Sequence, residues 1–318
     1  MTAAHRVLVT GAGGFVGRNI VRALLEDGHY VLALDRSFDG DVEPEWTSSA
    51  PGQVEVINGD AGDLPVLAVD AVIHGAAITA SPEEAGHTAE ENYRANLDSV
   101  LKVLEWCQRQ GVRRTIVLSS GAVYRSTAPG PVDEMMPTSP LGLYAVAKDA
   151  AEKLVETLRV EYRRDVIIVR LSNIYGPYER ARASRPRLSL VAKMVRAALD
   201  QGYLVVYRQE PALDWTYAPD IGRAVERLLT APELRYHLYH AASEQLLTAL
   251  DIAQGIKAVL PQVKLDVREG REPAGSPRSR LGYLSSERLR TELGIEHWTP
   301  FEQGLQNVIA WQQTENVP

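Results

Sequence analysis

Cysteine is almost absent from this sequence, which has 318 residues and a single cysteine, Cys107. One thiol excludes a disulfide within the chain and any metal site that needs several cysteines. The seven histidines show no metal-ligand spacing either, so we expect no bound metal ion. A low cysteine content favours a reducing compartment, and we therefore expect a cytoplasmic location.

An excess of positive charge and a long apolar run are absent as well. The 34 basic and 41 acidic residues give a net charge of −7, which repels the phosphates of nucleic acids and of anionic lipids. The chain leads from Met1 straight into Val7–Val9, without an apolar stretch long enough for a signal peptide or a membrane span. We expect a small-molecule partner rather than nucleic acid or a membrane.

What is present is a regular alternation of short apolar runs with longer segments of helical spacing. Runs that are nearly continuous in apolar residues are typical of strands covered on both faces. Their alternation with helices predicts an α/β fold with a Rossmann-type, doubly wound parallel sheet. The expected strands lie at residues 7–9, 30–34, 54–57, 71–73, 115–118 and 166–170, and the expected helices at 16–26, 90–110 and 144–162.

The pattern changes after Asn173, which indicates a smaller C-terminal domain that holds the substrate. We expect residues 1–172 to form the NAD-binding Rossmann domain and residues 173–318 to form mainly the substrate-binding domain. Further expected features are a helix at 190–201, a segment at about 214–230 that packs back on the Rossmann domain, and surface loops at 39–52 and 126–142.

A glycine-rich turn, Thr10–Gly17, follows the first expected strand and leads directly into a helix. In this order, free backbone N–H groups and the positive end of the helix dipole face a pyrophosphate, although glycine spacing alone also fits an ordinary turn. Asp35 ends the second strand, and its carboxylate suits the ribose hydroxyls of NAD and repels the extra phosphate of NADP. NADP is the less favoured alternative, because the guanidinium of Arg36 can hold its extra phosphate.

Tyr144 and Lys148 stand four residues apart in an expected helix and therefore share one face. A nearby ammonium group lowers the pKa of a phenol, which makes tyrosine a better base. Ser120 ends an expected strand, at the sheet edge where open α/β folds bind ligands. The pair alone also fits a solvated lysine beside a half-buried tyrosine. The Tyr144–Lys148 pair and Ser120 follow the glycine turn and Asp35 along the chain. This order predicts an NAD-dependent enzyme that oxidises or reduces a secondary alcohol.

Together these motifs resemble the extended short-chain dehydrogenase/reductase family, in particular its NAD-dependent epimerase/dehydratase branch, over nearly the whole chain. The resemblance rests on the segments Thr10–Gly17, Gly59-Asp60, His74–Ala77, Ser119–Tyr124, Tyr144–Lys148 and Arg170–Pro177, and on Asn96. It implies four catalytic residues, namely Ser120, Tyr144, Lys148 and Asn96. The implied cofactor contacts are Gly11, Gly14, Phe15, Val16, Gly17, Asp35, Arg36, Asp60, Ala61, Ala76, Tyr144 and Lys148.

Two departures from the family pattern bear on the substrate. Dehydratases of this branch resemble one another in an Asp-Glu pair after the catalytic hydroxyl residue, whereas Gly121 and Ala122 here argue against a dehydratase. Members that bind nucleotide sugars commonly have an arginine where this chain has Leu213, which cannot bind phosphate. The segment Arg180–Arg187 offers guanidiniums for an anion, or it is a solvated basic loop. The substrate candidates are Thr79, Asn173, Arg180, Arg182, Arg187, Trp215 and Arg271, although Trp215 equally fits a domain core.

Three functions fit these features. The first is a sugar or nucleotide-sugar epimerase, in which hydride passes to bound NAD and returns to the other face. The second is an NAD-dependent dehydrogenase of a free sugar, sugar acid or polyol, which Leu213 favours. The third is a non-catalytic NAD-sensing protein, and the intact Ser120, Tyr144 and Lys148 argue against it.

The resemblance also implies a homodimer, in which the helices at residues 90–110 and 144–162 pair across the dimer axis. Both helices carry broad aliphatic faces that exceed what one sheet face covers. These faces include Val100, Leu104, Leu154 and Leu158.

Overall fold

The computed structural model describes residues 4–38, 46, 50–124, 130–271 and 282–315, so the loops expected at 39–52 and 126–142 lie partly outside the described residues. Its centre is a seven-stranded sheet in which neighbouring strands pair in parallel, as the sequence predicts. In spatial order the strands are β10 (Leu238–Ala241), β6 (Val166–Leu171), β5 (Arg114–Ser120), β4 (Ala71–His74), β1 (Arg6–Thr10), β2 (Tyr30–Asp35) and β3 (Gln53–Asn58).

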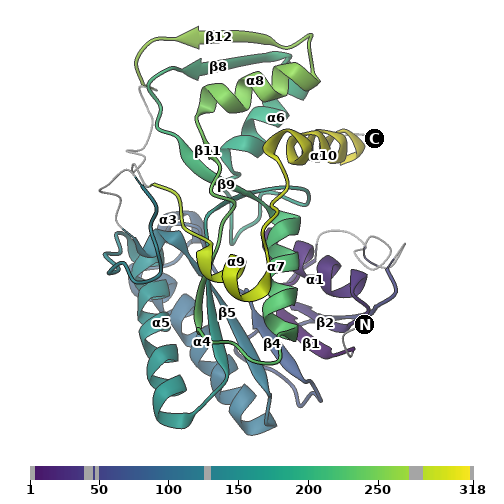
Figure 1. The fold of residues 1–318 in the computed structure, drawn as a ribbon, viewed down its shortest axis with the longest axis vertical. Coiled ribbons are helices and arrows are strands. Elements are labelled where there is room, and N and C mark those ends of the chain that lie inside the picture. Colours follow the sequence, from purple (N-terminus) through teal and green to yellow (C-terminus); the bar gives the residue numbers. More distant parts are fainter. Residues whose placement is uncertain (1–3, 39–45, 47–49, 125–129, 272–281, 316–318) are drawn as a thin grey trace.

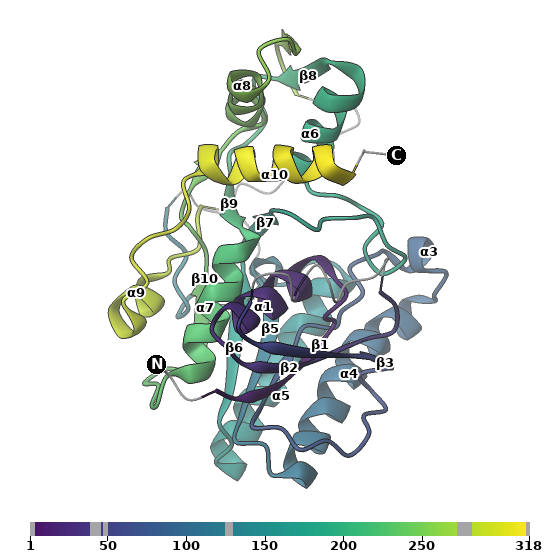
Figure 2. The ribbon, with the colours of Figure 1, turned by 90° about the vertical axis from the view of Figure 1, so that its right-hand side faces the viewer.

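Helices cover both faces of this sheet (Figures 1 and 2). One face carries α1 (Phe15–Glu26) and α7 (Ala218–Thr230), and the other carries α4 (Ala89–Gln110) and α5 (Leu143–Tyr162). Successive residues of β1 point to opposite faces, so Val7 packs in the core with α1 while Leu8 packs with Val103 of α4. This two-sided burial explains the near-continuous apolar strands, and the doubly wound Rossmann-type sheet is confirmed.

A second, smaller cluster of elements lies beyond the carboxyl ends of the strands, in the upper part of Figure 1. It has its own apolar core, which includes Val195, Ile252, Leu305 and Trp215. Its helices are α6 (Leu190–Gln201), α8 (Ala249–Val259) and α10 (Phe301–Glu315), and its strands are β7 (Asn173–Tyr175), β8 (Tyr203–Tyr207), β9 (Leu213–Tyr217), β11 (Leu246–Leu247) and β12 (Lys264–Arg268).

The C-terminal half also returns to the large sheet. Helix α7 packs against α1, and a Cβ on Gly222 would stand 2.5 Å from the carbonyl oxygen of Asn19. Strand β10 pairs with β6 as the seventh strand, which the sequence did not predict. This strand is only four residues long and contains the polar His240, so its pattern is too short and too mixed to identify a buried strand.

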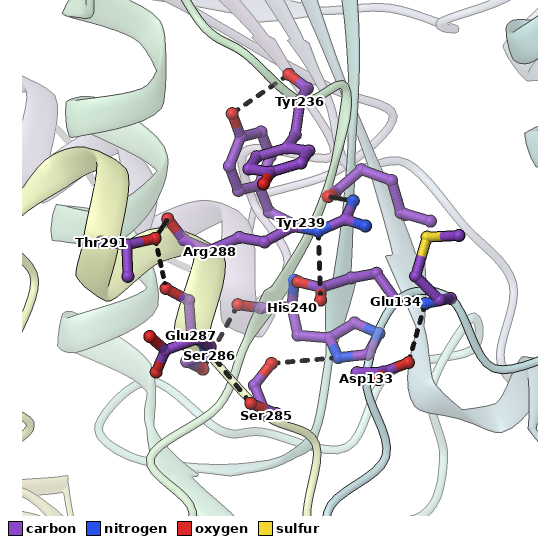
Figure 3. A network of polar contacts seen from close by, with 12 residues as sticks. Asp133, Glu134, Tyr236, Tyr239, His240, Ser285, Ser286, Glu287, Arg288 and Thr291 are labelled. Carbon is purple, nitrogen blue, oxygen red and sulfur yellow. Dashed lines mark hydrogen bonds and ion pairs between the residues drawn. The ribbon is translucent and has the colours of Figure 1, made fainter.

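A buried polar network holds β10 and α9 (Glu287–Leu293) against the loop after β5 (Figure 3). The N–H of His240 donates to Glu134 Oε1 (3.0 Å), and its Nδ1 lies 3.2 Å from the carbonyl oxygen of Ser285. Arg288 lies 3.4 Å from Glu134 and donates to the carbonyl oxygen of Leu238 (2.8 Å). Burial, helped by the nearby Arg170, lowers the pKa of His240 to about 3. This histidine is therefore a neutral structural element at physiological pH.

Candidate active site

Two adjoining cavities of about 300 Å³ and about 590 Å³ lie along the carboxyl ends of the strands. They meet between β1 and β4, where the order of strand addition reverses and open α/β sheets bind their ligands. The residues that line both cavities are Gly11, Gly14, Gly75, Ala77, Arg182 and Ser184. The two cavities therefore form one cleft with its junction at the glycine turn.

The glycine turn needs its glycines for close backbone contact. Gly11 has a φ of +73°, and a Cβ there would stand 2.6 Å from the backbone nitrogen of Ala76. A Cβ on Gly17 would stand 2.0 Å from the carbonyl oxygen of Gly11. Gly14 caps α1 without any side-chain hydrogen bond, and the first turn of α1 carries no acidic residue. The N–H groups at this helix start are thus open to an anion from the cleft.

The smaller cavity is lined by the carboxylate at the end of β2. Asp35 accepts hydrogen bonds from the N–H groups of Gly13 (3.1 Å) and Ser37 (3.2 Å), which leaves further acceptor capacity toward the cavity. Seven of the residues that the sequence assigns to the cofactor line this cavity, namely Gly11, Gly14, Asp35, Arg36, Asp60, Ala61 and Ala76. Lys102 of α4 also lines it, and the sequence reading did not identify this residue.

The larger cavity brings together the serine, tyrosine and lysine that the sequence singles out. Lys148 is buried, donates from Nζ to the carbonyl oxygen of Leu118 (2.8 Å) and lies 5.8 Å from the centre of the Tyr144 ring. Burial lowers the pKa of Lys148 to about 8, and the carboxylate of Glu152 acts in the opposite direction. Burial raises the pKa of Tyr144, while a hydrogen bond with the Ser120 side chain acts to lower it.

Glu152 is a further residue of this site that the sequence reading missed. It lies one helical turn beyond Lys148, is buried, and accepts a hydrogen bond from the hydroxyl of Ser119, the neighbour of Ser120. Arg170 of β6 donates from Nε to both Glu152 oxygens (3.0 and 3.1 Å). The i,i+4 spacing from Lys148 could have indicated that Glu152 lies on the same face of α5. Its partners Ser119 and Arg170 belong to β5 and β6, which helical spacing does not predict.

Asn96 and His74 lie behind the cavity wall. The Asn96 side chain accepts from the N–H of Ile78 (2.9 Å) and donates to the Ile78 carbonyl oxygen (3.0 Å) and to that of Asn92 (3.2 Å). The amide is thereby occupied in fixing the loop after β4. His74 contacts Thr10 (2.8 Å) and Ser99 (3.4 Å), and burial lowers its pKa to about 3.

Six of the seven substrate candidates line the larger cavity, namely Thr79, Asn173, Arg180, Arg182, Arg187 and Trp215. Arg271 is exposed and lines neither cavity. Leu213 does line the larger cavity, so an apolar side chain occupies this part of the wall.

The wall of the larger cavity is strongly basic. The cations that line it are Lys148, Arg180, Arg182, Arg185, Arg187 and Lys193, and no aspartate or glutamate of the described chain joins them. Arg180 pairs with Glu315 and Arg187 with Glu84. Lys193 of α6 has no ion-pair partner among the described residues. Arg185 belongs to the basic Arg180–Arg187 segment that the sequence offers for an anion. Lys193 was not predicted, because helical spacing alone does not tell which face of α6 meets the cleft.

Searches against known proteins give a consistent picture. The family model of the NAD dependent epimerase/dehydratase family matches residues 7–259. A dTDP-glucose 4,6-dehydratase of Streptomyces niveus is 27% identical over 96% of this chain and 92% of its own length. A UDP-glucose 4-epimerase of Mycolicibacterium smegmatis is 31% identical over 54% of this chain and 57% of its own length.

Solved structures share the whole fold. The protein MoeE5, solved in complex with UDP-glucuronic acid and NAD, superimposes with a TM-score of 0.81 at 24% identity, covering 98% of this chain and 99% of that one. The family assignment supports NAD as the cofactor. The described part of the chain contains no helix that is both long and apolar enough to cross a membrane.

Proposed function

The chain belongs to the NAD-dependent epimerase/dehydratase family, and from this we propose that it is an NAD-dependent epimerase that acts on a secondary alcohol of a nucleotide sugar. One observation carries the proposal. Ser120, Tyr144 and Lys148 line a single cavity that opens at the glycine turn into the cavity of Asp35. A proton-transfer group therefore lies beside a site for a dinucleotide, as alcohol oxidation requires.

The residues of the cleft fit NAD. The open helix start at Gly14 suits the pyrophosphate, and the carboxylate of Asp35 suits the hydroxyls of the adenosine ribose. We assign Asp60 and Ala61 to the adenine end, because they line the same cavity as Asp35. Bound in this cleft, NAD would supply the acceptor, and later the donor, of the hydride that the alcohol carbon exchanges.

Tyr144 is the proposed acid and base, and Ser120 positions the substrate oxygen through its hydroxyl. Burial alone makes the phenol reluctant to ionise, so its base function depends on neighbours that favour the phenolate. Ser120 and Arg185 both act to lower the pKa of Tyr144. The Nζ of Lys148 lies 5.8 Å from the centre of the Tyr144 ring. Asn96 is proposed to position the loop after β4 rather than to contact the substrate, because its amide is occupied by Ile78.

A dehydratase is disfavoured by the short helix η1 (Gly121–Val123), which follows Ser120. Elimination of water needs an acid and a base near the sugar, and Gly121 and Ala122 carry neither. Because no carboxylate of the described residues lines the larger cavity, no other acidic side chain there replaces them.

The basic wall supports an anionic substrate. A diphosphate of a nucleotide sugar suits Lys193, Arg180 and Arg185 on this wall, which would compensate for the apolar Leu213. The second candidate function is a dehydrogenase of a sugar acid or another free sugar, and Leu213 on the cavity wall favours it. The two differ in one respect, since a dehydrogenase releases NADH after each turnover and an epimerase retains its cofactor.

Three further assignments are part of the proposal. Residues 1–172 are proposed to bind NAD and residues 173–318 mainly the substrate, supported by the separate apolar core around α6, α8 and α10. A cytoplasmic location is supported by the single cysteine. A homodimer is supported by exposed apolar residues on α5, such as Val146 and Val160, although Val100 and Leu104 are buried under the sheet and are not available for it.

The function is tested with a Tyr144→Phe variant. Wild-type protein is incubated with UDP- and dTDP-sugars, free sugars and sugar acids, and epimers and NADH are measured separately. Loss of the phenol should reduce turnover by about 10²- to 10⁴-fold and leave the NAD content of the purified protein unchanged. Full turnover in the variant contradicts the assignment, and NAD binding without turnover on any substrate in the wild type indicates a sensor.

A further inference from the structure

We propose that Arg182, contributed by the substrate-side loop, is a cofactor-binding residue whose guanidinium contacts the diphosphate of NAD, and that its hairpin closes over the bound dinucleotide. The hairpin consists of Arg182–Arg185, where backbone hydrogen bonds of 3.0 and 2.9 Å join its two ends. We call this segment the arginine hairpin.

The arginine hairpin lies at the junction of the two cavities. Arg182 and Ser184 line both the cavity of Asp35 and the cavity of Tyr144. A dinucleotide that reaches from one to the other must pass its diphosphate through the junction, where the helix start at Gly14 lies. The hairpin is therefore placed at the part of the cofactor that carries negative charge.

Arg182 reaches across the cleft to the end of β2. Its Nη2 donates to the hydroxyl and the carbonyl oxygen of Ser37, directly after β2, and its Nη1 lies 3.2 Å from the place of a Cβ on Gly13. The guanidinium thus lies beside the glycine turn, although its chain segment comes from beyond β7. Charge-assisted hydrogen bonds from arginine to phosphate are among the strongest in proteins, and they add to the field of the helix start.

Backbone and side-chain contacts hold the arginine hairpin across the cleft. The carbonyl oxygen of Ser184 accepts hydrogen bonds from the N–H groups of Thr79 (2.9 Å) and Ala80 (3.1 Å), which belong to the loop after β4. Arg185 lies over the ring of Phe15, the first residue of α1, and donates to the buried Glu179 (2.8 Å). The hairpin is thereby joined to the ends of β1, β2 and β4, so NAD leaves only after these contacts open.

A closed hairpin gives the cofactor a long residence time. A long residence time suits the proposed function, because an epimerase must keep its reduced cofactor until the hydride returns. This consequence of the closed hairpin rests on the proposed epimerase function. It also reassigns Arg182, which the sequence predicts as a substrate residue.

The test measures the release of NAD rather than activity. Wild type, Arg182→Ala and Arg187→Ala are loaded with a fluorescent NAD analogue, and its dissociation rate is followed after addition of excess NAD. Arg187 is a matched control, because it belongs to the same loop but pairs with Glu84 and has a side chain that is 70% exposed. Arg182→Ala should release the analogue about 10- to 100-fold faster, and Arg187→Ala should match the wild type.

Binding of ADP and adenosine identifies the group that Arg182 contacts. Arg182→Ala should weaken the binding of ADP and leave the binding of adenosine unchanged. An unchanged dissociation rate in Arg182→Ala overturns the proposal even if turnover falls, since Arg182 then acts on the substrate. A loss of adenosine binding equal to that of ADP also overturns it. Failure of the proposed function appears separately, as turnover that survives Tyr144→Phe.

Discussion

At the residue scale, the proposed active site depends on how one buried cation, Lys148, is held. Lys148 faces Tyr144 on its own helix, His74 from β4, and Glu152 one turn further along α5. His74 is neutral because burial lowers its pKa to about 3, so Glu152 is the charged group that stabilises the ammonium. Glu152 is itself fixed by Ser119 and Arg170. We infer that it is a positioning residue for both Lys148 and the serine strand.

Activity should depend on the protonation state of Lys148. The ammonium form of Lys148 is lost as the pH rises through its pKa of about 8, and activity should decline over the same range. Because Glu152 acts to raise this pKa, Glu152→Gln should move the decline in kcat/KM to lower pH. Glu156→Gln is the control, since Glu156 lies one turn further and pairs with His237. Equal pH profiles for wild type and Glu152→Gln contradict the role given to Glu152.

At the element scale, strand β9 links the two parts of the molecule. It pairs in parallel with β7 and in antiparallel with β11, and it places Leu213 and Trp215 on the cavity wall. Between them, Asp214 points into the protein, where its Oδ2 accepts from the N–H of Leu284 (3.0 Å) and its Oδ1 has no hydrogen-bond partner among the described residues. Burial raises the pKa of this carboxyl group to about 7.

The element-scale prediction follows from this raised pKa. In the unfolded chain Asp214 loses its proton near pH 4, whereas in the folded chain it keeps the proton until about pH 7. The contribution of the group to stability is complete at low pH and is lost as the pH rises between these values. Relative to Asp214→Asn, the wild type should therefore lose about 4 kcal/mol of unfolding free energy between pH 4 and pH 8.

Urea denaturation of both proteins across this pH range measures the difference. Asp251→Asn is a suitable control, because Asp251 is an exposed capping residue at the start of α8. A constant difference between wild type and Asp214→Asn over the whole range would show that the carboxyl group is ionised in the folded protein.

At the scale of the whole molecule, the C-terminal half has two tasks. It forms the basic wall of the larger cavity. It also contributes α7, which packs against α1, and β10, which pairs with β6 as the seventh strand of the sheet. The polar network around His240 and Arg288 fastens this return (Figure 3). The cleft is therefore framed by chain segments that are distant in sequence.

The whole-molecule prediction is the oligomeric state. If α4 and α5 pair across a dimer axis, light scattering should give twice the mass of one chain, and Leu154→Glu on α5 should produce a monomer, since a buried charge at an apolar interface is costly. Val205→Glu is the control, because Val205 is 39% exposed but lies on β8, far from α5. A dimer that survives Leu154→Glu contradicts the proposed interface.

The sequence by itself determined six of the seven strands of the parallel sheet, the glycine turn, NAD as cofactor and the places of Ser120, Tyr144 and Lys148 in the chain. Short segments of sequence are enough to predict these features, because strand burial, turn geometry and helical spacing each depend on a few neighbouring residues. Only the tertiary structure decided that β10 completes the sheet, that Glu152 meets Ser119 and Arg170, and that Arg182 reaches the cofactor cleft. Each of these depends on contacts between segments distant along the chain, and local spacing carries no information about which distant segments meet.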